Sequence, residues 1–221
     1  MPKLEKSDLL EWFSAGAKPS IEWKIGTEHE KFVFNIKNSK RVNYSGPSGI
    51  SELLDTVASK HNWDKIIENN NTIGLKDNTG ASISLEPGGQ LELSGTPLEN
   101  LHETCKETGM HLKIMKEVMN ELDLSMVGIG YDPKWKRSDI GWMPKGRYEI
   151  MKNYMPKVGN LGLDMMLRTC TIQVNLDYSS EKDMVEKFQI SLALQSVATA
   201  LFANSPFIEG KESGYLSARA M

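Results

Sequence analysis

The stretch Ile83-Ser-Leu-Glu-Pro-Gly-Gly-Gln-Leu-Glu-Leu-Ser-Gly95 places two carboxylates in an extended, mostly apolar run. Such a run predicts a β-strand, whose side chains alternate between two faces. Glu86 and Glu92 are an even number of residues apart, so a regular strand would project both from the same face. The Pro-Gly-Gly sequence between them could instead carry a bulge that changes this parity.

A second acidic run, Gly26-Thr-Glu-His-Glu-Lys31, lies upstream. Glu28 and Glu30 are expected on one face of a strand, about 7 Å apart, and His29 on the other face as a packed or hydrogen-bonded residue. Four acids on two strands repel one another unless a cation lies among them. Mg2+ carrying the phosphates of a nucleotide is the candidate, because it takes oxygen ligands from a few carboxylates plus phosphate.

The chain as a whole has 221 residues, of which 39% are apolar, enough for one large domain with its own core. A net charge of −3 gives no argument for a nucleic-acid partner. The sequence contains no apolar run of the roughly 18 residues that a membrane-spanning helix needs, and its first residues do not resemble a secretory signal. Cys105 and Cys170 lack metal-type spacing and are expected to be buried thiols, so we expect a reducing, cytoplasmic location.

Secondary-structure patterns indicate strands separated by helices. Apolar spacing predicts a helix over 50–58, preceded by Ser48 as a cap, and Asp77-Asn-Thr-Gly80 predicts a turn between two strands. The other expected elements are a helix at 7–13, strands at 21–36, 72–76, 82–94, 126–131 and 167–178, a long helix that begins at 96–99, a helix at 147–154 and a helix that starts at Ser180. This order predicts an α+β domain with a largely antiparallel sheet, packed against helices on one face and polar on the other.

The expected strand at 167–178 alternates most regularly. Its polar side carries Thr169, Thr171, Gln173, Asn175 and Asp177. A polar strand face can simply meet bulk water in an antiparallel sheet. If this strand shares a sheet with the two glutamate runs, its polar side would instead line one concave site, where the amides of Gln173 and Asn175 bind metal or phosphate oxygens without adding charge.

Three basic residues are candidates for binding an anionic substrate. The guanidinium groups of Arg147 and Arg168 can pair with a carboxylate through two parallel hydrogen bonds, and Lys145 can contact phosphate. The alternative for each is an ion pair on the surface. Strict alternation would place Arg168 on the apolar side with Cys170, so its role requires an irregularity at the start of the strand.

These residues belong to five long motifs: Trp23-Lys-Ile-Gly-Thr-Glu-His-Glu-Lys31, Ser84-Leu-Glu-Pro-Gly-Gly-Gln-Leu-Glu-Leu-Ser-Gly95, Met143-Pro-Lys-Gly-Arg-Tyr-Glu-Ile-Met151, Asn153-Tyr-Met-Pro-Lys-Val-Gly159 and Leu163-Asp-Met-Met-Leu-Arg-Thr-Cys-Thr-Ile-Gln-Val-Asn-Leu-Asp177. In this order they resemble glutamate–cysteine ligase of the plant and proteobacterial type. The resemblance extends from about Trp23 to Tyr215.

The resemblance implies an ATP-dependent ligase that catalyses the first step of glutathione biosynthesis. ATP phosphorylates the γ-carboxylate of L-glutamate, and the amine of L-cysteine then displaces phosphate from γ-glutamyl phosphate. The implied fold is a glutamine-synthetase-like cup, in which a curved, largely antiparallel sheet has helices outside. The expected partners are glutamate, cysteine and ATP, with two or more Mg2+ ions; a homodimer is also expected, and neither nucleic acid nor a membrane.

The resemblance also assigns roles to individual residues. The implied metal ligands are Glu28, Glu30, Glu92 and Gln173. Glu86 is either a further ligand or an acid that supports one, and it is grouped with Asn175 as a contact of the nucleotide. The implied substrate-binding residues are Arg147, Arg168, Thr169 and Lys145, of which the two arginines hold the α-carboxylate of glutamate or neutralise phosphate and are the expected catalytic residues.

Members of that family continue well past Phe207. Residues 1–221 are therefore expected to form the N-terminal portion of a single larger catalytic domain, incomplete at its C-terminal side. Two alternatives stay open at this point. One is another γ-glutamyl or carboxylate–amine ligase that accepts a different amine, and the other is an inactive fragment that acts only as a binding domain.

Overall fold

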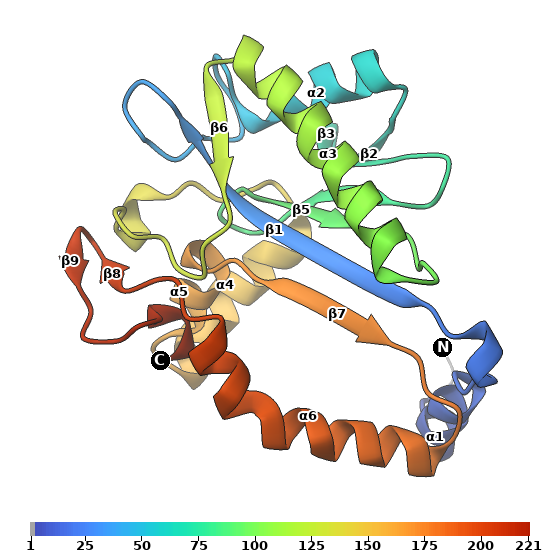
Figure 1. The fold of residues 1–221 in the computed structure, drawn as a ribbon. Coiled ribbons are helices and arrows are strands. Elements are labelled where there is room, and N and C mark those ends of the chain that lie inside the picture. The colour runs from blue at the N-terminus through green and yellow to red at the C-terminus, as the bar shows by residue number, and fades with distance from the viewer. Residues whose placement is uncertain (1–2) are drawn as a thin grey trace.

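A computed structural model describes residues 3–221 of the chain. It contains helices and strands of mixed order (Figure 1). The helices are α1 (Lys6–Ala15), α2 (Ile50–His61), α3 (Leu101–Glu121), α4 (Gly146–Val158), α5 (Gly162–Arg168) and α6 (Glu181–Leu201). The strands are β1 (Ile25–Asn35), β2 (Asp64–Glu68), β3 (Asn71–Lys76), β4 (Ser82–Leu85), β5 (Gln90–Ser94), β6 (Leu124–Val127), β7 (Ile172–Leu176), β8 (Phe207–Ile208) and β9 (Lys211–Glu212).

The main sheet is antiparallel throughout, which confirms the predicted class of fold. Its strand order is β2-β3-β4-β5-β1-β6, and β7 also pairs with β1. The long strand β1 pairs with β5 along one edge, while its other edge is divided between β7, opposite 25–29, and β6, opposite 32–35. This central position of β1 explains why its residues meet side chains from three other strands.

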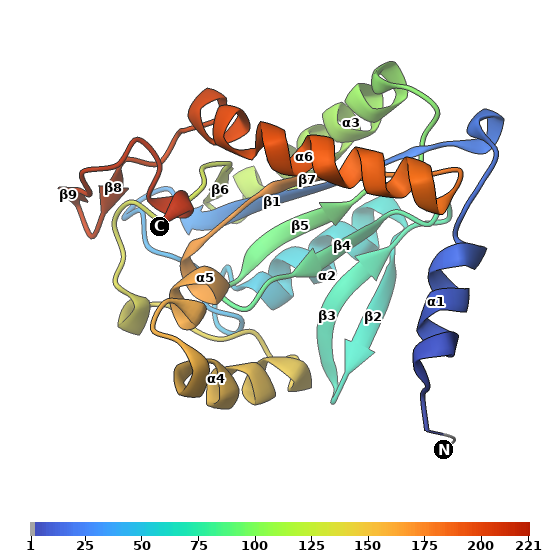
Figure 2. The same ribbon diagram turned by 90° about the horizontal axis from the view of Figure 1, so that it is seen from below.

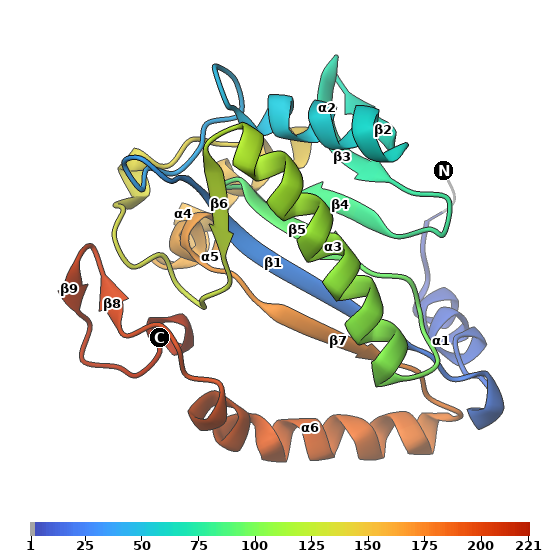
Figure 3. The same ribbon diagram turned by 45° about the horizontal axis from the view of Figure 1, so that its top comes forward.

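Helices α2 and α3 cover one face of the sheet, as the tilted view shows (Figure 3). Their apolar faces pack on the apolar side of β3, β4 and β5, in a cluster that includes Leu53, Leu54, Leu75, Ile83 and Met115. Each of these five side chains is fully buried. Burial of this size is the main stabilising contribution to such a layer, at about 25 cal/mol for each Å² of apolar surface removed from water.

The two long runs predicted as single strands are interrupted. The run 82–94 is a hairpin, because Glu86–Gly89 forms a turn between β4 and β5 that Gly89 enters at φ 78°, a conformation that favours glycine. The run 167–178 begins as helix α5, and β7 starts only at Ile172. A role for Arg168 in the site required an irregularity at the start of the expected strand. That irregularity is the change from helix α5 to strand β7.

Three further expectations about elements are corrected. The long helix α3 begins at Leu101, and its cap is Asn100, whose side chain accepts hydrogen bonds from the amides of His102 and Glu103. Helix α2 is preceded by Gly49 without a side-chain cap, so Ser48 does not have the predicted role. Strand β2 was not predicted, because its residues Asp64–Glu68 are largely exposed and carry no buried alternation.

Helix α6 starts after Ser180, as predicted, and the Ser180 hydroxyl accepts a hydrogen bond from the amide of Asp183. The view from below shows it crossing in front of this part of the sheet (Figure 2). Its large apolar side chains are exposed, as are those of β7: Val185, Phe188, Ile190, Leu192, Leu194, Val197, Leu201, Ile172, Val174 and Leu176. Within residues 3–221, no helix is both long and apolar enough to cross a membrane.

Candidate functional site

The glutamates of β1 lie on the sheet face opposite α3. Glu30 is directly opposite Glu92 on β5, and Glu28 is directly opposite Gln173 on β7. Residues paired in this way project from the same face of a sheet. The structure therefore pairs β1 with β5, the strands of the two glutamate runs, and pairs β1 also with β7. The three strands expected around one polar site form a row on this face.

Two carboxylates, those of Glu30 and Glu86, line a cavity of about 290 Å³ at one end of this row. It is lined by residues that include Glu30, Glu86, Arg147, Thr169 and Arg219. The pKa of Glu30 is raised to about 7, first by burial and then by the charges of Glu86 and Glu92, while the Thr171 amide that donates to its carboxylate acts in the opposite direction. The pKa of Glu86 is also raised, first by burial and then by Glu92. These carboxylates repel one another in a partly dry environment.

Cationic side chains approach the same carboxylates. The Nη2 atom of Arg147 lies 3.7 Å from Oε1 of Glu86. Lys145 immediately precedes α4, and its pKa is lowered first by burial and next by Arg147, while Glu86 and Glu92 act in the opposite direction. Lys145 and Arg147 both lie against the ring of Tyr148, whose hydroxyl donates to the carbonyl of Leu85. This contact fixes the start of α4 beside the β4–β5 hairpin.

Arg219 is a site residue that the sequence analysis missed. It lines the cavity and its charge lowers the pKa of Glu30. The turn that carries it is fixed by a hydrogen bond from the amide of Ala218 to the carbonyl of Ser205 and by a contact between the Ser205 and Ser217 hydroxyls. It lies outside the five motifs, in a short 3-10 helix over Ala218–Ala220, so only its place in the same cavity as Glu30 identifies it.

The other end of the polar row is exposed. Oε1 of Glu28 accepts hydrogen bonds from Nε2 of Gln173 at 2.9 Å and from Nδ2 of Asn175 at 3.0 Å. The Gln173 amide also donates to Oδ1 of Asn175. These three predicted residues therefore form one connected group, on the same face as Glu30 but next to the open edge of β7.

Arg168 and Thr169 have different surroundings although they are adjacent. Arg168 is buried outside the cavity, where it pairs with Asp164 at 2.6 Å and with Glu209 at 3.0 Å and lies over the ring of Tyr131. Thr169 lines the cavity, and its hydroxyl donates to the carbonyl of Met165. A substrate contact of Arg168 stays a prediction, and its observed partners are acidic side chains of this chain.

The donor set can be compared with the needs of a divalent cation. In the part of the chain that the structure describes, no group of three or more His, Cys, Asp or Glu side chains has the spacing of a metal site. The chemistry nevertheless fits, since Glu30, Glu86 and Glu92 offer oxygen donors whose mutual repulsion a cation would relieve. The carboxylates would have to approach one another by rotation of their side chains.

The two cysteines differ from expectation at one position. Cys170 is buried, as predicted, whereas Cys105 is exposed. The buried face of α3 carries Thr104, His111, Met115, Val118 and Met119. Cys105 follows Thr104 and is turned by about 100° from it around the helix axis, which directs the thiol away from the sheet.

Residues 24–221 match the sequence profile described as Glutamate-cysteine ligase family 2 (GCS2). The chain is 58% identical over 217 residues to "Glutamate--cysteine ligase B, chloroplastic" of Oryza sativa subsp. japonica, covering 98% of this chain and 43% of that protein. It is 57% identical to the chloroplastic enzyme of Medicago truncatula and 56% identical to that of Arabidopsis thaliana, covering 98% of this chain and 42% and 41% of those proteins.

The chain spans about two fifths of the length of these curated relatives. Their names place them in the chloroplast, which contradicts the predicted cytoplasmic location. That prediction rested on the two free thiols, and free thiols do not distinguish one reducing compartment from another. The predicted family is confirmed. With a family profile that matches residues 24–221 and identities of 56–58%, the chain belongs to glutamate-cysteine ligase family 2.

Proposed function

We propose that this chain supplies the glutamate- and nucleotide-binding part of an ATP-dependent ligase that joins the γ-carboxylate of L-glutamate to the amine of L-cysteine, the first step of glutathione biosynthesis. The observation that carries this proposal is the cavity in which Glu30 and Glu86 face Arg147 and Arg219. A site with both charges suits a substrate that arrives as an anion together with a metal-bound nucleotide. The names of the relatives support the reaction and favour the plastid as its location.

The acidic side of the cavity would hold Mg2+. Glu30, Glu86 and Glu92 would supply ligands at one end, and Glu28 with Gln173 at the other, so the row has room for two or more ions. Asn175 orients Glu28 through its hydrogen bond and is the proposed contact of the nucleotide. Bound Mg2+ would neutralise phosphate charge during transfer of the γ-phosphoryl group.

The basic side of the cavity would hold glutamate. The guanidinium groups of Arg147 and Arg219 are suited to the α-carboxylate, which they can bind through two parallel hydrogen bonds. Lys145, whose ammonium group is partly buried near Glu86, would contact the transferred phosphoryl group. Thr169, which also lines the cavity, would exclude water beside the γ-carboxylate. Attack of the cysteine amine on γ-glutamyl phosphate then forms the amide and releases phosphate.

The arrangement of the whole ligase is also a proposal. Residues 1–221 would form part of one catalytic domain, which the hydrophobic cluster shared by α2, α3 and the sheet supports. The sheet of the whole domain would be cup-shaped and glutamine-synthetase-like. The exposed apolar side chains of α6 and β7 support burial against further polypeptide, either of the same ligase or of a second copy in a homodimer.

Release of ADP tests the proposed reaction. The purified chain is incubated with ATP and Mg2+, then with glutamate, and finally with glutamate and cysteine. ADP formation that requires both amino acids, and that Glu30→Gln abolishes while Glu186→Gln on the exposed side of α6 does not, is the expected result. ADP release without either amino acid would contradict the proposal. For a silent but folded chain, calorimetric binding of glutamate in the presence of Mg2+ and a non-hydrolysable ATP analogue decides whether the site exists.

A further inference from the structure

The turn that carries Glu86 is held by contacts from three distant parts of the chain. The carbonyl of Pro87 accepts a hydrogen bond from the amide of Met143 at 2.9 Å. Nε2 of Gln90, a side chain that is 1% exposed, donates to the carbonyls of Met166 and Thr169. The carbonyl of Gly88 accepts from Nη2 of Arg41 at 2.6 Å. Of these contacts, the one from Arg41 to Gly88 is made by a charged side chain.

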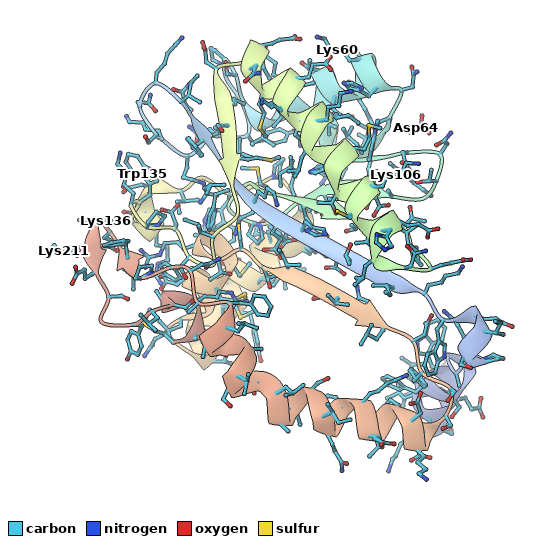
Figure 4. The ribbon with its side chains drawn as sticks, in the orientation of Figure 1. Lys60, Asp64, Lys106, Trp135, Lys136 and Lys211 are labelled. Atoms are coloured by element: carbon cyan, nitrogen blue, oxygen red, sulfur yellow. The ribbon has the colours of Figure 1, made fainter. Side chains whose placement is uncertain are left out.

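Arg41 is itself fixed by a buried carboxylate. Its Nη1 lies 2.9 Å from Oδ2 of Asp132, and the two side chains are 6% and 2% exposed. Oδ1 of Asp132 accepts from the amides of Lys134 and Trp135, so its orientation is set by the loop that contains them. Figure 4 shows Trp135 and Lys136 near the β8–β9 hairpin, where Lys211 lies.

The geometry around Gly88 leaves the turn little freedom on its other side. A Cβ atom at Gly88 would lie 2.6 Å from the carbonyl oxygen of Leu167, so the backbone of the turn is packed directly against α5. The guanidinium of Arg41 covers the ring of Phe32, 4.5 Å from its centroid, on the same sheet face as Glu30 two residues earlier. Arg41 therefore closes one end of the polar row and contacts the turn from there.

We propose that Arg41 is a positioning residue for the carboxylate site: through its hydrogen bond to Gly88 it sets the Glu86–Gly89 turn so that Glu86 faces Glu30 and Glu92. A buried charged pair is a costly way to stabilise a fold, because desolvation of both ions offsets most of their attraction. The pair instead fixes the orientation of the Arg41 side chain. Its planar guanidinium bonds Asp132 and Gly88 at once, and an ammonium group cannot reproduce this geometry. The effect on metal binding rests on the proposed function, whereas the effect on the turn does not.

Hydrogen exchange at single amides tests the positioning role. The amide of Gly89 donates to the carbonyl of Glu86 across the turn, and the amide of Leu53 donates to Gly49 in the distant helix α2. In Arg41→Lys, protection of the Gly89 amide should fall about tenfold or more, the loss expected for a hydrogen bond to a charged group, while protection at Leu53 stays within about twofold. The control Arg137→Lys, which changes the partner of Asp164 outside the turn, should change neither.

A double variant removes the risk that a lone buried charge unfolds the protein. Arg41→Met with Asp132→Asn deletes both charges, and it should fold and still lose protection at Gly89. Unchanged protection at Gly89 in both variants overturns the proposal, and so does an equal loss at Gly89 and Leu53, which would mean that Arg41 acts on stability alone.

A titration with Mg2+ alone connects the turn to the site. Isothermal calorimetry should show the apparent dissociation constant of Mg2+ rising about tenfold in Arg41→Lys and unchanged in Arg137→Lys. If the unaltered chain binds no Mg2+, the metal part of the proposed function fails, and the Gly89 amide still decides the role of Arg41. If Mg2+ binds equally to both proteins while Gly89 loses protection, the turn does not position the metal ligands and the inference is overturned.

Discussion

Glu30 and Glu92 lie directly opposite each other on the antiparallel strands β1 and β5, with their side chains on the same face of the sheet. Like charges in such a pair destabilise a sheet. The Ser94 hydroxyl donates to the Glu92 carboxylate and the Thr171 amide donates to that of Glu30, so both of these hydrogen bonds come from neutral donors. The pair is therefore destabilising on its own, and the proposed cation would relieve its repulsion.

Replacement of Glu30 by glutamine should stabilise the protein when Mg2+ is absent. Glu30→Gln removes the repulsion but keeps an oxygen that accepts from Thr171, so we expect the free energy of unfolding to rise by about 0.5 kcal/mol and the melting temperature by about 1–2 °C. The same variant should lose the stabilisation that Mg2+ gives the unaltered chain. Differential scanning calorimetry with EDTA and with Mg2+ measures both effects. Glu186→Gln is the matched control, and a lower melting temperature for Glu30→Gln in EDTA would contradict this reading.

Arg147 should distinguish glutamate from the nucleotide. Arg147→Lys keeps the charge near Glu86 but loses the planar fork that binds a carboxylate, so the dissociation constant of glutamate should rise about 10- to 100-fold. The dissociation constant of a non-hydrolysable ATP analogue with Mg2+ should change by less than about threefold. Calorimetry measures both ligands, with Arg137→Lys as the control. Equal losses for the two ligands would indicate a general disturbance of the site.

The two thiols should react at different rates. Cys105 is exposed, whereas Cys170 is buried and its pKa is raised, first by that burial and then by the charge of Glu30. A thiol-modifying reagent should therefore modify one cysteine quickly in the folded protein and the second only after unfolding in denaturant. Cys105→Ser should abolish the fast phase and Cys170→Ser should preserve it. Two fast phases in the unaltered chain would show that the environment of Cys170 opens readily.

His111 should make the protein less stable in mild acid. This side chain of α3 is 5% exposed, and burial, with the nearby Lys31 and His29, lowers its pKa from 6.5 to about 4. Between these two values the unfolded state binds a proton that the folded state does not, so the contribution is complete above pH 6.5 and is lost as the pH falls toward 4. At its largest the effect is about 3 kcal/mol.

Urea unfolding at pH 7.5 and at pH 4.5 measures this contribution. His111→Gln replaces the imidazole by a neutral amide, so its free energy of unfolding should depend less on pH than that of the unaltered chain. The control His102→Gln changes an exposed histidine at the start of the same helix and should leave the dependence unchanged. Parallel pH profiles for the unaltered chain and His111→Gln would contradict the assignment.

Much of this organisation could be predicted from sequence wherever the signal is local. Glu28 and Glu30 share a face because two residues return a side chain to the same side of a strand, and Ser180 caps α6 because its hydroxyl reaches an amide three residues on. The apolar spacing of α2 predicted its buried face, because residues three and four apart lie on the same side of a helix. The family resemblance added the roles, which residue patterns alone left open.

The remaining features depend on the tertiary structure, because they are set by contacts between segments far apart in the chain. The turn at Glu86–Gly89 broke the expected strand, and the register of β5 against β1 placed Glu92 opposite Glu30. Arg168 pairs with Asp164 and Glu209 outside the cavity, whereas Arg219, which is distant in sequence, lines the cavity. The sequence by itself determined which side chains share a face within a regular strand, such as Glu28 and Glu30, and that α6 begins after Ser180. Only the packing of distant segments decided which charges meet, because the energy of each meeting depends on burial and distance that local spacing does not encode.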